Sequence, residues 1–295
     1  MKIDNIEIAP FDNLLVYKPN YTSEIVRKII AEKKLGGLRI FSILKKDKVE
    51  NIDFLEQYDF LEKLDVTSLD DYNFNFLKNL GNLKKISINV GGSEEINFQH
   101  QKKLEKLIIK WRKKIRGLEE LKMLSSLVVI EFKVSDLTSL DDCKDRLLDL
   151  TIKTGSILSL NGLQGFMNLH NLSIGNCKKL VSIHGIDRLP KLKTLTIEKC
   201  PNIDYNSMVH LPSLESLSLI DCGKIDSVKF IKEFPMLTQL SLLGNTVIGD
   251  GDLEPLKHIR TLQHKHYSHY NLKLESPSYD QLVRNNLQKI KNLFK

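Results

Sequence analysis

Hydrophobic and polar positions alternate along the chain, most clearly in three stretches that begin at Leu172, Leu195 and Leu217 and read LSIGNCKKL, LTIEKCPNI and LSLIDCGKI. In each stretch, leucine or isoleucine occupies the first and third positions, with a small polar residue between them. Because successive side chains of a β-strand point to opposite faces, Leu195 and Ile197 lie on one face and Thr196 on the other. The pattern therefore predicts short strands with one buried and one exposed face.

The same unit recurs along most of the chain at intervals of 20 to 23 residues, and such fixed spacing is the signature of a repeat protein. If the hydrophobic residue that opens each strand is taken as its anchor, the units are anchored at Leu64, Ile86, Leu107, Ile130, Leu150, Leu172, Leu195, Leu217, Leu240 and Leu262. A less regular first unit, LGGLRIFSI, is anchored at Leu38. One unit cannot bury its hydrophobic face alone, so the sequence predicts ten to eleven stacked coils with a continuous core. Units this short leave room only for turns and short 3₁₀ segments opposite the sheet.

These units resemble leucine-rich repeats of the short, roughly 22-residue class found in bacterial internalins. The segment LVSIHGIDRLPKLKTLTI, for example, is similar to that class's L-x-x-I-x-G-I-x-x-L-x-x-L run. The resemblance is close from Leu147 onward and looser before it, and residues 35–268 are assigned to the repeats. It implies an α/β solenoid, a leucine-rich-repeat horseshoe with a parallel β-sheet on the concave face. The resemblance also implies short turns or 3₁₀ segments on the convex face and helical caps at both ends.

The two ends of the chain do not repeat, and solenoid ends need caps because they expose the core. Residues 1–34 are assigned to an N-terminal cap. Within it, TSEIVRKIIAEKKLGG predicts a helix with Thr22 or Ser23 as its N-cap and Gly36 near its end. Residues 269–295 are predicted to form a C-terminal capping helix, with a partner-binding or membrane-surface helix as the alternative.

Three cysteines share one position of the repeat, five residues after the anchor: Cys177, Cys200 and Cys222. The resemblance implies that this position points inward, where Asn or Cys bonds to backbone groups of the turn that leaves the strand. Asn245 stands at the same position of the next unit, an exchange that suits a polar ladder and not a thiolate metal cluster. These four residues are therefore predicted to form a structural ladder, and neither a metal nor a cofactor is expected.

Composition narrows the classes of function. The 295 residues are 41% hydrophobic and 27% charged, and 44 Lys and Arg against 37 Asp and Glu give a net charge of +7. This composition is that of a globular chain, and its modest basic excess suits an acidic partner without requiring nucleic acid. The sequence has no signal-peptide core and no hydrophobic run of about 18 residues. Because four cysteines are also too few for a disulfide framework, a cytoplasmic protein without membrane contact is expected.

Few residues suggest catalysis. No phosphate-binding glycine loop, H-E-x-x-H, G-x-S-x-G or calcium loop occurs. Cys143 and Asp145 match the C-x-D motif of bacterial leucine-rich-repeat ubiquitin ligases, but those enzymes carry it in a separate helical domain, so the match is interpreted as accidental. His264, His266 and His269 have a spacing that can bind a metal, yet a decaying last repeat is the simpler interpretation.

The exposed face of the predicted sheet carries the functional hypothesis. In the register above, three consecutive coils place Lys110, Lys133 and Lys153 side by side, and the segment KWRKKIR adds Trp111, the only tryptophan. A tryptophan flanked by cations is the composition of an interface hot spot. A solvated basic turn with Trp111 packed on the rim is the alternative. The predicted partner-binding residues are Lys85, Lys106, Lys110, Trp111, Arg112, Glu131, Lys133 and Lys153.

These features favour a non-enzymatic scaffold for protein–protein interaction, a monomer that binds an acidic protein partner on its concave face. The resemblance to small cytoplasmic bacterial repeat proteins implies a finer hypothesis, an immunity protein or inhibitor that neutralises a bacterial toxin. The alternative is binding of nucleic acid or a phosphate ligand through Lys110, Lys133 and Lys153. It is disfavoured because acidic residues such as Glu131 and Asp149 are interleaved with the cations.

Overall fold

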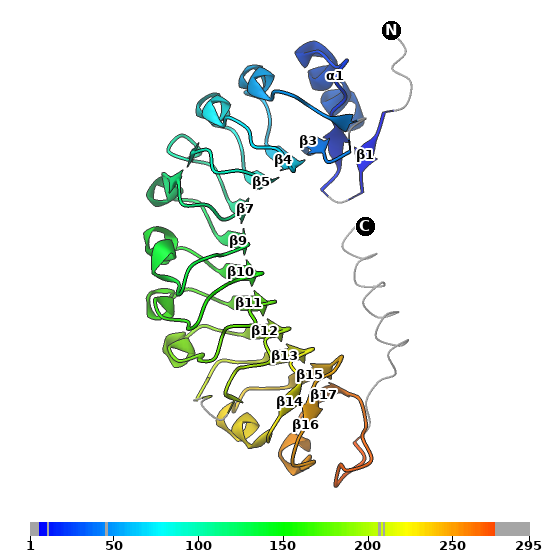
Figure 1. Ribbon diagram of the computed structural model, residues 1–295, viewed down its shortest axis with the longest axis vertical. Coiled ribbons are helices and arrows are strands. Elements are labelled where there is room, and N and C mark those ends of the chain that lie inside the picture. Colours follow the sequence, from blue (N-terminus) through cyan, green and yellow to red (C-terminus); the bar gives the residue numbers. More distant parts are fainter. Residues whose placement is uncertain (1–5, 11, 45–46, 206–207, 209, 275–295) are drawn as a thin grey trace.

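The structure, a computed structural model, describes residues 6–10, 12–44, 47–205, 208 and 210–274. Within them, one thirteen-stranded sheet follows the inner edge of an arc (Figure 1). β1 and β2 are antiparallel, and each later pair of neighbours is parallel. The strands are β1 (Ile8–Ala9), β2 (Leu14–Val16), β3 (Gly37–Ser42), β4 (Lys63–Ser68), β5 (Lys85–Val90), β7 (Lys106–Lys110), β9 (Ser126–Ile130), β10 (Asp149–Lys153), β11 (Asn171–Gly175), β12 (Thr194–Glu198), β13 (Ser216–Ile220), β15 (Gln239–Leu243) and β17 (Thr261–His264). The fold is the predicted α/β solenoid, with the parallel sheet on the concave face and eleven strands from β3 to β17.

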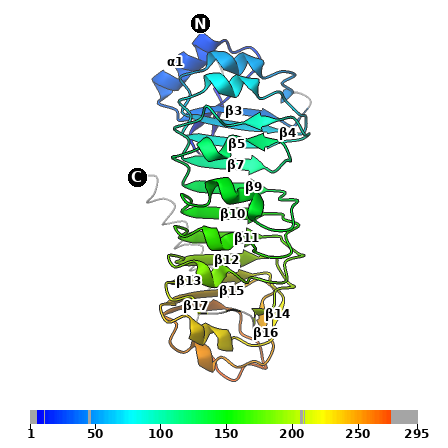
Figure 2. The same cartoon turned by 90° about the vertical axis from the view of Figure 1, so that its left-hand side faces the viewer.

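The convex side consists of turns and short 3₁₀ helices, as predicted for coils too short to hold full α-helices. The 3₁₀ helices of the described residues are Asp53–Gln57, Asn75–Asn79, Leu118–Glu120, Thr138–Cys143, Leu163–Gly165, Ile186–Arg188, Lys229–Glu233 and Glu254–Leu256. Seen from that side, they stack in front of the strands (Figure 2). Two small parallel sheets were not predicted: β6 (Ile96–Asn97) with β8 (Ile115–Arg116), and β14 (Lys224–Ile225) with β16 (Val247–Ile248). None of the described helices has the length and apolarity that a membrane crossing needs.

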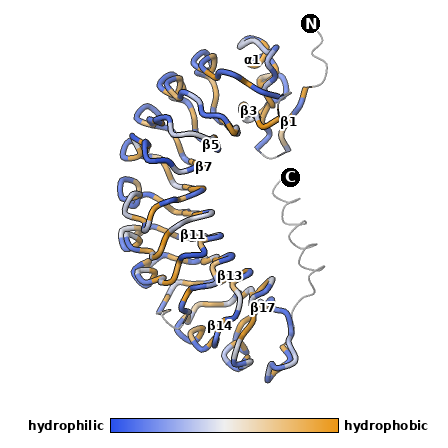
Figure 3. Tube along the Cα trace, in the orientation of Figure 1, coloured by the Kyte–Doolittle hydropathy of each residue, from blue (hydrophilic) through white to orange (hydrophobic). Residues whose placement is uncertain are grey.

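One large hydrophobic core runs through the stacked coils, and a small separate cluster of Ala9, Leu14 and Val16 lies in the β1–β2 hairpin. The inward residues of each strand are fully buried, as Leu195 and Ile197 show, and hydrophobic residues alternate with hydrophilic ones around each coil (Figure 3). Phenylalanines such as Phe132 and Phe166 are fully buried in this core. Burying one such side chain contributes about 1.5–3 kcal/mol, so the stack is stabilised mainly by contacts between neighbouring coils.

The register of the parallel sheet aligns the predicted anchors, with one exception. Leu107 pairs with Leu127, and Leu127 pairs with Leu150, so the anchor of this coil is Leu127. The prediction of Ile130 is wrong by three residues. Because the segment LVVI is apolar at four successive positions, its alternation does not reveal which residues face the core.

The N-terminal end is closed by the β1–β2 hairpin and by α1 (Ser23–Lys33). The Thr22 side chain accepts a hydrogen bond from Ile25 N–H (3.3 Å), which confirms the N-cap. The helix ends at Lys33, near Gly36 as expected, and Lys34 takes the left-handed conformation of its C-cap, with φ 51°. Of the segment predicted as a C-terminal capping helix, residues 275–295 lie outside the described residues.

Candidate protein-binding surface

Three of the four cysteines form the predicted ladder inside the solenoid. Cys177, Cys200 and Cys222 are fully buried. The thiol of Cys200 lies 3.9 Å from the carbonyl oxygen of Ile174, and that of Cys222 lies 3.4 Å from the carbonyl oxygen of Ile197. Each thiol also lies close to a carbonyl oxygen of its own strand, Glu198 O for Cys200 (3.3 Å) and Ile220 O for Cys222 (3.4 Å), so its one proton is shared between two neighbouring coils. Burial raises the pKa of the Cys222 thiol, which keeps it protonated and suits a hydrogen-bond donor.

The ladder continues at Thr246, and the prediction of Asn245 is wrong. The buried hydroxyl of Thr246 accepts a hydrogen bond from Cys222 N–H (3.1 Å) and donates to Leu219 O (3.2 Å). The turn after β15 is one residue longer than in the preceding coils. Gly244, with φ 66°, adopts the left-handed conformation there, and Asn245 is displaced to the surface.

Arg112 is also an inward residue, so its assignment to partner binding is wrong. It stands five residues after its anchor, the position that the cysteines hold further along the chain, and its side chain is only 4% exposed. The guanidinium donates to the carbonyl oxygens of Val90 (3.3 Å), Gly91 (3.1 Å) and Glu94 (3.0 Å) and pairs with Asp71 at 3.2 Å. We call these five residues the Arg112 cluster.

Asp71 anchors that cluster. Its carboxylate accepts hydrogen bonds from the backbone N–H groups of Ser93 (2.5 Å) and Glu94 (2.8 Å) in addition to Arg112. Burial by itself raises the pKa of Asp71, but these hydrogen bonds and the positive charge of Arg112 outweigh it and lower the pKa below its ordinary value. In the coil of β7, a buried guanidinium paired with a partly exposed carboxylate thus takes the place of the ladder thiol.

The side chains considered for chemistry do not assemble into a reactive site. Cys143 is fully buried, its thiol donates to Leu140 O (3.2 Å), and burial raises its pKa to about 12. His264 pairs with Leu242 in the sheet, as its inward repeat position predicts, and His269 Nε2 lies 2.8 Å from Ile248 O. Among the described residues no group of three or more His, Cys, Asp or Glu could hold a metal ion.

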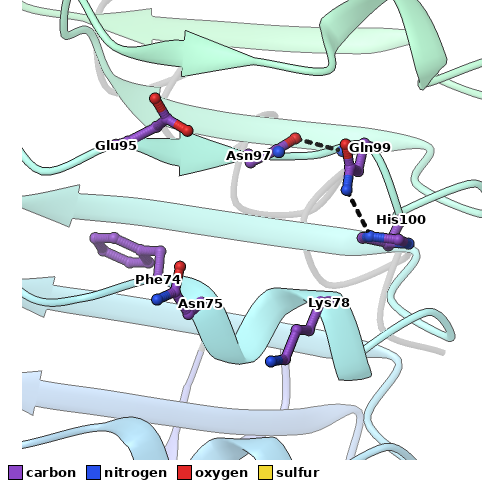
Figure 4. Close-up of a pocket in the computed structure, with 7 residues that line it drawn as sticks. All are labelled: Phe74, Asn75, Lys78, Glu95, Asn97, Gln99 and His100. Atoms are coloured by element: carbon purple, nitrogen blue, oxygen red, sulfur yellow. Dashed lines mark hydrogen bonds between the residues drawn. The ribbon is translucent and has the colours of Figure 1, made fainter.

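A pocket of about 180 Å³ lies on the convex side, between the Asn75–Asn79 helix and β6 (Figure 4). Lys78 and His100 border it, and the His100 ring is hydrogen-bonded to Gln99 (2.7 Å). Nothing in this pocket pairs a nucleophile with a base, so the concave face is the better candidate.

On the concave face, the predicted row of three lysines is interrupted. The corrected register of β9 places Ile130 between Lys110 and Lys153. Glu131 and Lys133 lie beyond the end of β9, where the Glu131 carboxylate pairs with Lys110 (2.8 Å) and with Lys133 (3.3 Å). The hydrogen bond from Lys110 is the largest cause of a lowered pKa of Glu131. The prediction that Lys110, Lys133 and Lys153 are adjacent is therefore wrong.

Trp111 lies just beyond the end of β7, on the rim of the solenoid. Its ring meets Phe132 edge to face, with centroids 5.0 Å apart and planes at 74°. It also lines a rim pocket of about 310 Å³ together with Ile115 and Val134. The structure therefore places Trp111 in the rim packing that was the alternative for this residue.

Three other lysines do lie side by side. Lys63, Lys85 and Lys106 occupy the first position of β4, β5 and β7, where Lys85 pairs with both of the others in the register. All three side chains are partly exposed on the concave face. We call them the lysine column. Lys63 was missed at the sequence level, although each of these lysines directly precedes the anchor of its coil.

Beside the lysine column, the concave face carries an apolar centre of Ile108, Val128 and Ile130. Ile108 pairs with Val128 across β7 and β9, and Ile130 follows two residues later on the same face. All three are partly exposed. Further along, the same column as Val128 holds small hydroxyl residues, namely Thr151, Ser173, Thr196, Ser218 and Ser241.

Comparison with solved structures finds leucine-rich-repeat proteins at low sequence identity. An internalin of Listeria monocytogenes is 17% identical with a TM-score of 0.41, over 74% of this chain and 78% of that one. A chain of the mouse RP105/MD-1 complex is 15% identical with a TM-score of 0.43, over 72% of this chain and 44% of that one. A leucine-rich-repeat protein of Leptospira interrogans is 16% identical with a TM-score of 0.36, over 92% of this chain and 97% of that one. Neither a protein-family model nor a curated protein matches the chain. The leucine-rich-repeat assignment therefore stands on the register, ladder and stacked coils of the chain itself.

Proposed function

We propose that this protein is a non-enzymatic scaffold that binds a protein partner on its concave face. The observation that carries the proposal is the apolar centre of Ile108, Val128 and Ile130, which lies partly exposed on the rigid sheet. Hydrophobic residues in the middle of a patch, surrounded by charged ones, are the usual composition of a protein interface. Lys106 and Lys110 flank Ile108 on the same strand and supply the charged surround.

The finer form of the proposal is an inhibitor or immunity protein that covers an acidic enzyme or toxin. An arc with a continuous inner surface can enclose a folded partner, and a basic surround speeds the approach of an acidic one. A cytoplasmic, monomeric protein that acts without a cofactor belongs to the same proposal.

Binding of nucleic acid through Lys110, Lys133 and Lys153 has less support. Glu131 already pairs with Lys110 and Lys133, and Ile130 separates Lys110 from Lys153. Binding of a phosphate backbone depends on cations that are available to neutralise phosphates, and two of these three lysines are already paired with a carboxylate.

The test compares two valine-to-lysine variants as bait in a pull-down from the native host. Val128→Lys places a charge in the apolar centre, whereas Val181→Lys makes the same change at a side chain that is 53% exposed elsewhere on the solenoid. We expect a stoichiometric protein to be retained by the wild type and by Val181→Lys and to be lost with Val128→Lys. Thermal melting of both variants shows that they are folded. Equal retention by all three baits would refute concave binding.

A further inference from the structure

The lysine column places three like charges on adjacent strands. Neighbouring strands are about 4.8 Å apart, and like charges directly opposite one another are destabilising. Lys63, Lys85 and Lys106 are paired in this way along β4, β5 and β7. A column of this kind is stabilised by anions that lie across it.

One carboxylate already occupies the middle of the column. Asp12, in the turn of the β1–β2 hairpin, forms an ion pair with Lys85, 73 positions away in sequence. Gly36 N–H donates to Asn13 O (2.8 Å), which holds the hairpin turn beside the sheet. Lys85 is consequently only 19% exposed, and Asp12 is 36% exposed.

The outer two lysines have no such partner. Within the described part of the chain, neither Lys63 nor Lys106 forms an ion pair. They are two strands apart, or about 10 Å, so two carboxylates of one protein segment can reach both.

We propose that the lysine column is a docking strip for an acidic protein segment that lies across β4, β5 and β7, and that Asp12 competes with that segment for Lys85. The inference rests on the proposed function and specifies the partner: its acidic side chains meet Lys63 and Lys106. Ile108 faces the same side as Lys106, two residues along β7, so a hydrophobic side chain of the partner follows the acidic segment onto the apolar centre.

The surroundings of the column favour carboxylates of a protein over a phosphate backbone. Asp65 lies two residues after Lys63 on the same face of β4, and its carboxylate pairs with Arg39 at 3.4 Å. The charge of Asp65 acts on either kind of anion, whereas the apolar surface of Ile108 beside the column can be covered by a hydrophobic side chain of a protein segment and not by a phosphate backbone.

Binding of a fluorescein-labelled octaglutamate peptide, followed by fluorescence anisotropy at low salt, tests this inference. We expect Lys63→Gln with Lys106→Gln to weaken binding about five-fold, since the peptide then loses two exposed ion pairs, each of modest strength. The matched control is Lys122→Gln with Lys179→Gln, which removes the same charge from exposed lysines outside the concave face and leaves binding unchanged. Equal weakening by both double variants would overturn the strip.

Asp12→Asn gives the sharper result, because it removes a carboxylate and is expected to tighten peptide binding by about two- to five-fold. Lys85→Gln in the same chain should abolish that gain, whereas Lys85→Gln alone should change binding little. Weaker or unchanged binding by a folded Asp12→Asn variant would overturn the competition.

Two further outcomes separate this inference from the proposed function. A fluorescein-labelled oligothymidylate that binds more tightly than the peptide, through the same lysines, would overturn the assignment to an acidic protein segment. A partner that is lost with Val128→Lys yet bound equally by the Lys63/Lys106 variant and by wild type would also overturn the docking strip. That second result would leave the concave scaffold in place.

Discussion

Replacing Arg112 by methionine tests the largest disagreement between sequence and structure. Methionine keeps a long unbranched side chain against Phe74, whose ring lies 5.7 Å from the guanidinium, but it removes four hydrogen-bonding contacts. The carbonyl oxygens of Val90, Gly91 and Glu94 lose their donor, and Asp71 loses its cation. Arg112 is buried but Asp71 is 24% exposed, so most of the cost comes from the carbonyl oxygens that lose their donor. A buried group left without its partner costs about 1–3 kcal/mol, and we expect a loss of unfolding free energy of about 2–4 kcal/mol.

The assay is urea unfolding followed by circular dichroism, with Arg116→Met as the matched control. Arg116 pairs with Glu95 at 2.9 Å, but its side chain is 71% exposed, so the same substitution there should cost less than about 1 kcal/mol. An Arg112→Met variant as stable as Arg116→Met would refute the buried cluster and return Arg112 to the candidate interface.

The difference in unfolding free energy between wild type and Arg112→Met should depend on pH, and the pKa of Asp71 gives the direction. The pKa of Asp71 lies below its ordinary value of 3.8 in the folded protein, so the stability that this carboxylate contributes is complete above that value. It is lost as pH falls through the lower, folded-state pKa. The gap between wild type and Arg112→Met should therefore narrow at pH 3 relative to pH 7, and the three carbonyl contacts of Arg112 should keep it from closing. A gap that widens at pH 3 would contradict the charge pairing.

Two further predictions concern the ladder. Thr246→Val should lower the unfolding free energy by about 1–3 kcal/mol, because Cys222 N–H loses its buried acceptor. Asn245→Ala removes only an exposed contact with Gly223 N–H and should cost less than about 1 kcal/mol. If urea unfolding shows that Asn245→Ala is the more destabilising of the two, Asn245 belongs to the ladder after all. All four cysteines are free and buried, so Ellman's reagent should titrate no thiol in the native protein and four in denaturant. Rapid reaction of a thiol in the native protein would contradict the burial of these side chains.

The repeat could be predicted from the sequence wherever polar residues mark the exposed face. From Leu150 to Leu262 the predicted anchors and the observed register agree throughout. The anchor of the β9 coil was predicted wrongly because this strand is apolar on both faces. Intervals of 23 then 20 residues fit the chain between Leu107 and Leu150 as well as 20 then 23, so only the three-dimensional pairing identifies Leu127.

The candidate surface was harder to predict, because it depends on contacts between residues distant in sequence. Lys85 and Lys106 were recognised, but the charge of Lys85 is met by Asp12, 73 positions away. Arg112 looked like an exposed cation because its partner Asp71 lies 41 positions earlier. Composition identifies an excess of positive charge, whereas the folded chain determines which of those charges remain open to a partner.

The ladder has a consequence for how this protein can change in length. Cys200 contacts Ile174 and Cys222 contacts Ile197, each in the coil before its own. Deletion of residues 178–200 would therefore set Cys222 against Ile174, with an anchor spacing that the chain already uses. The Arg112 cluster spans β4 to β7 and permits no such excision. The serine-rich half of the arc is thus modular and can lengthen or shorten by whole coils to suit partners of different size, while the half that holds the lysine column and the apolar centre keeps a fixed shape.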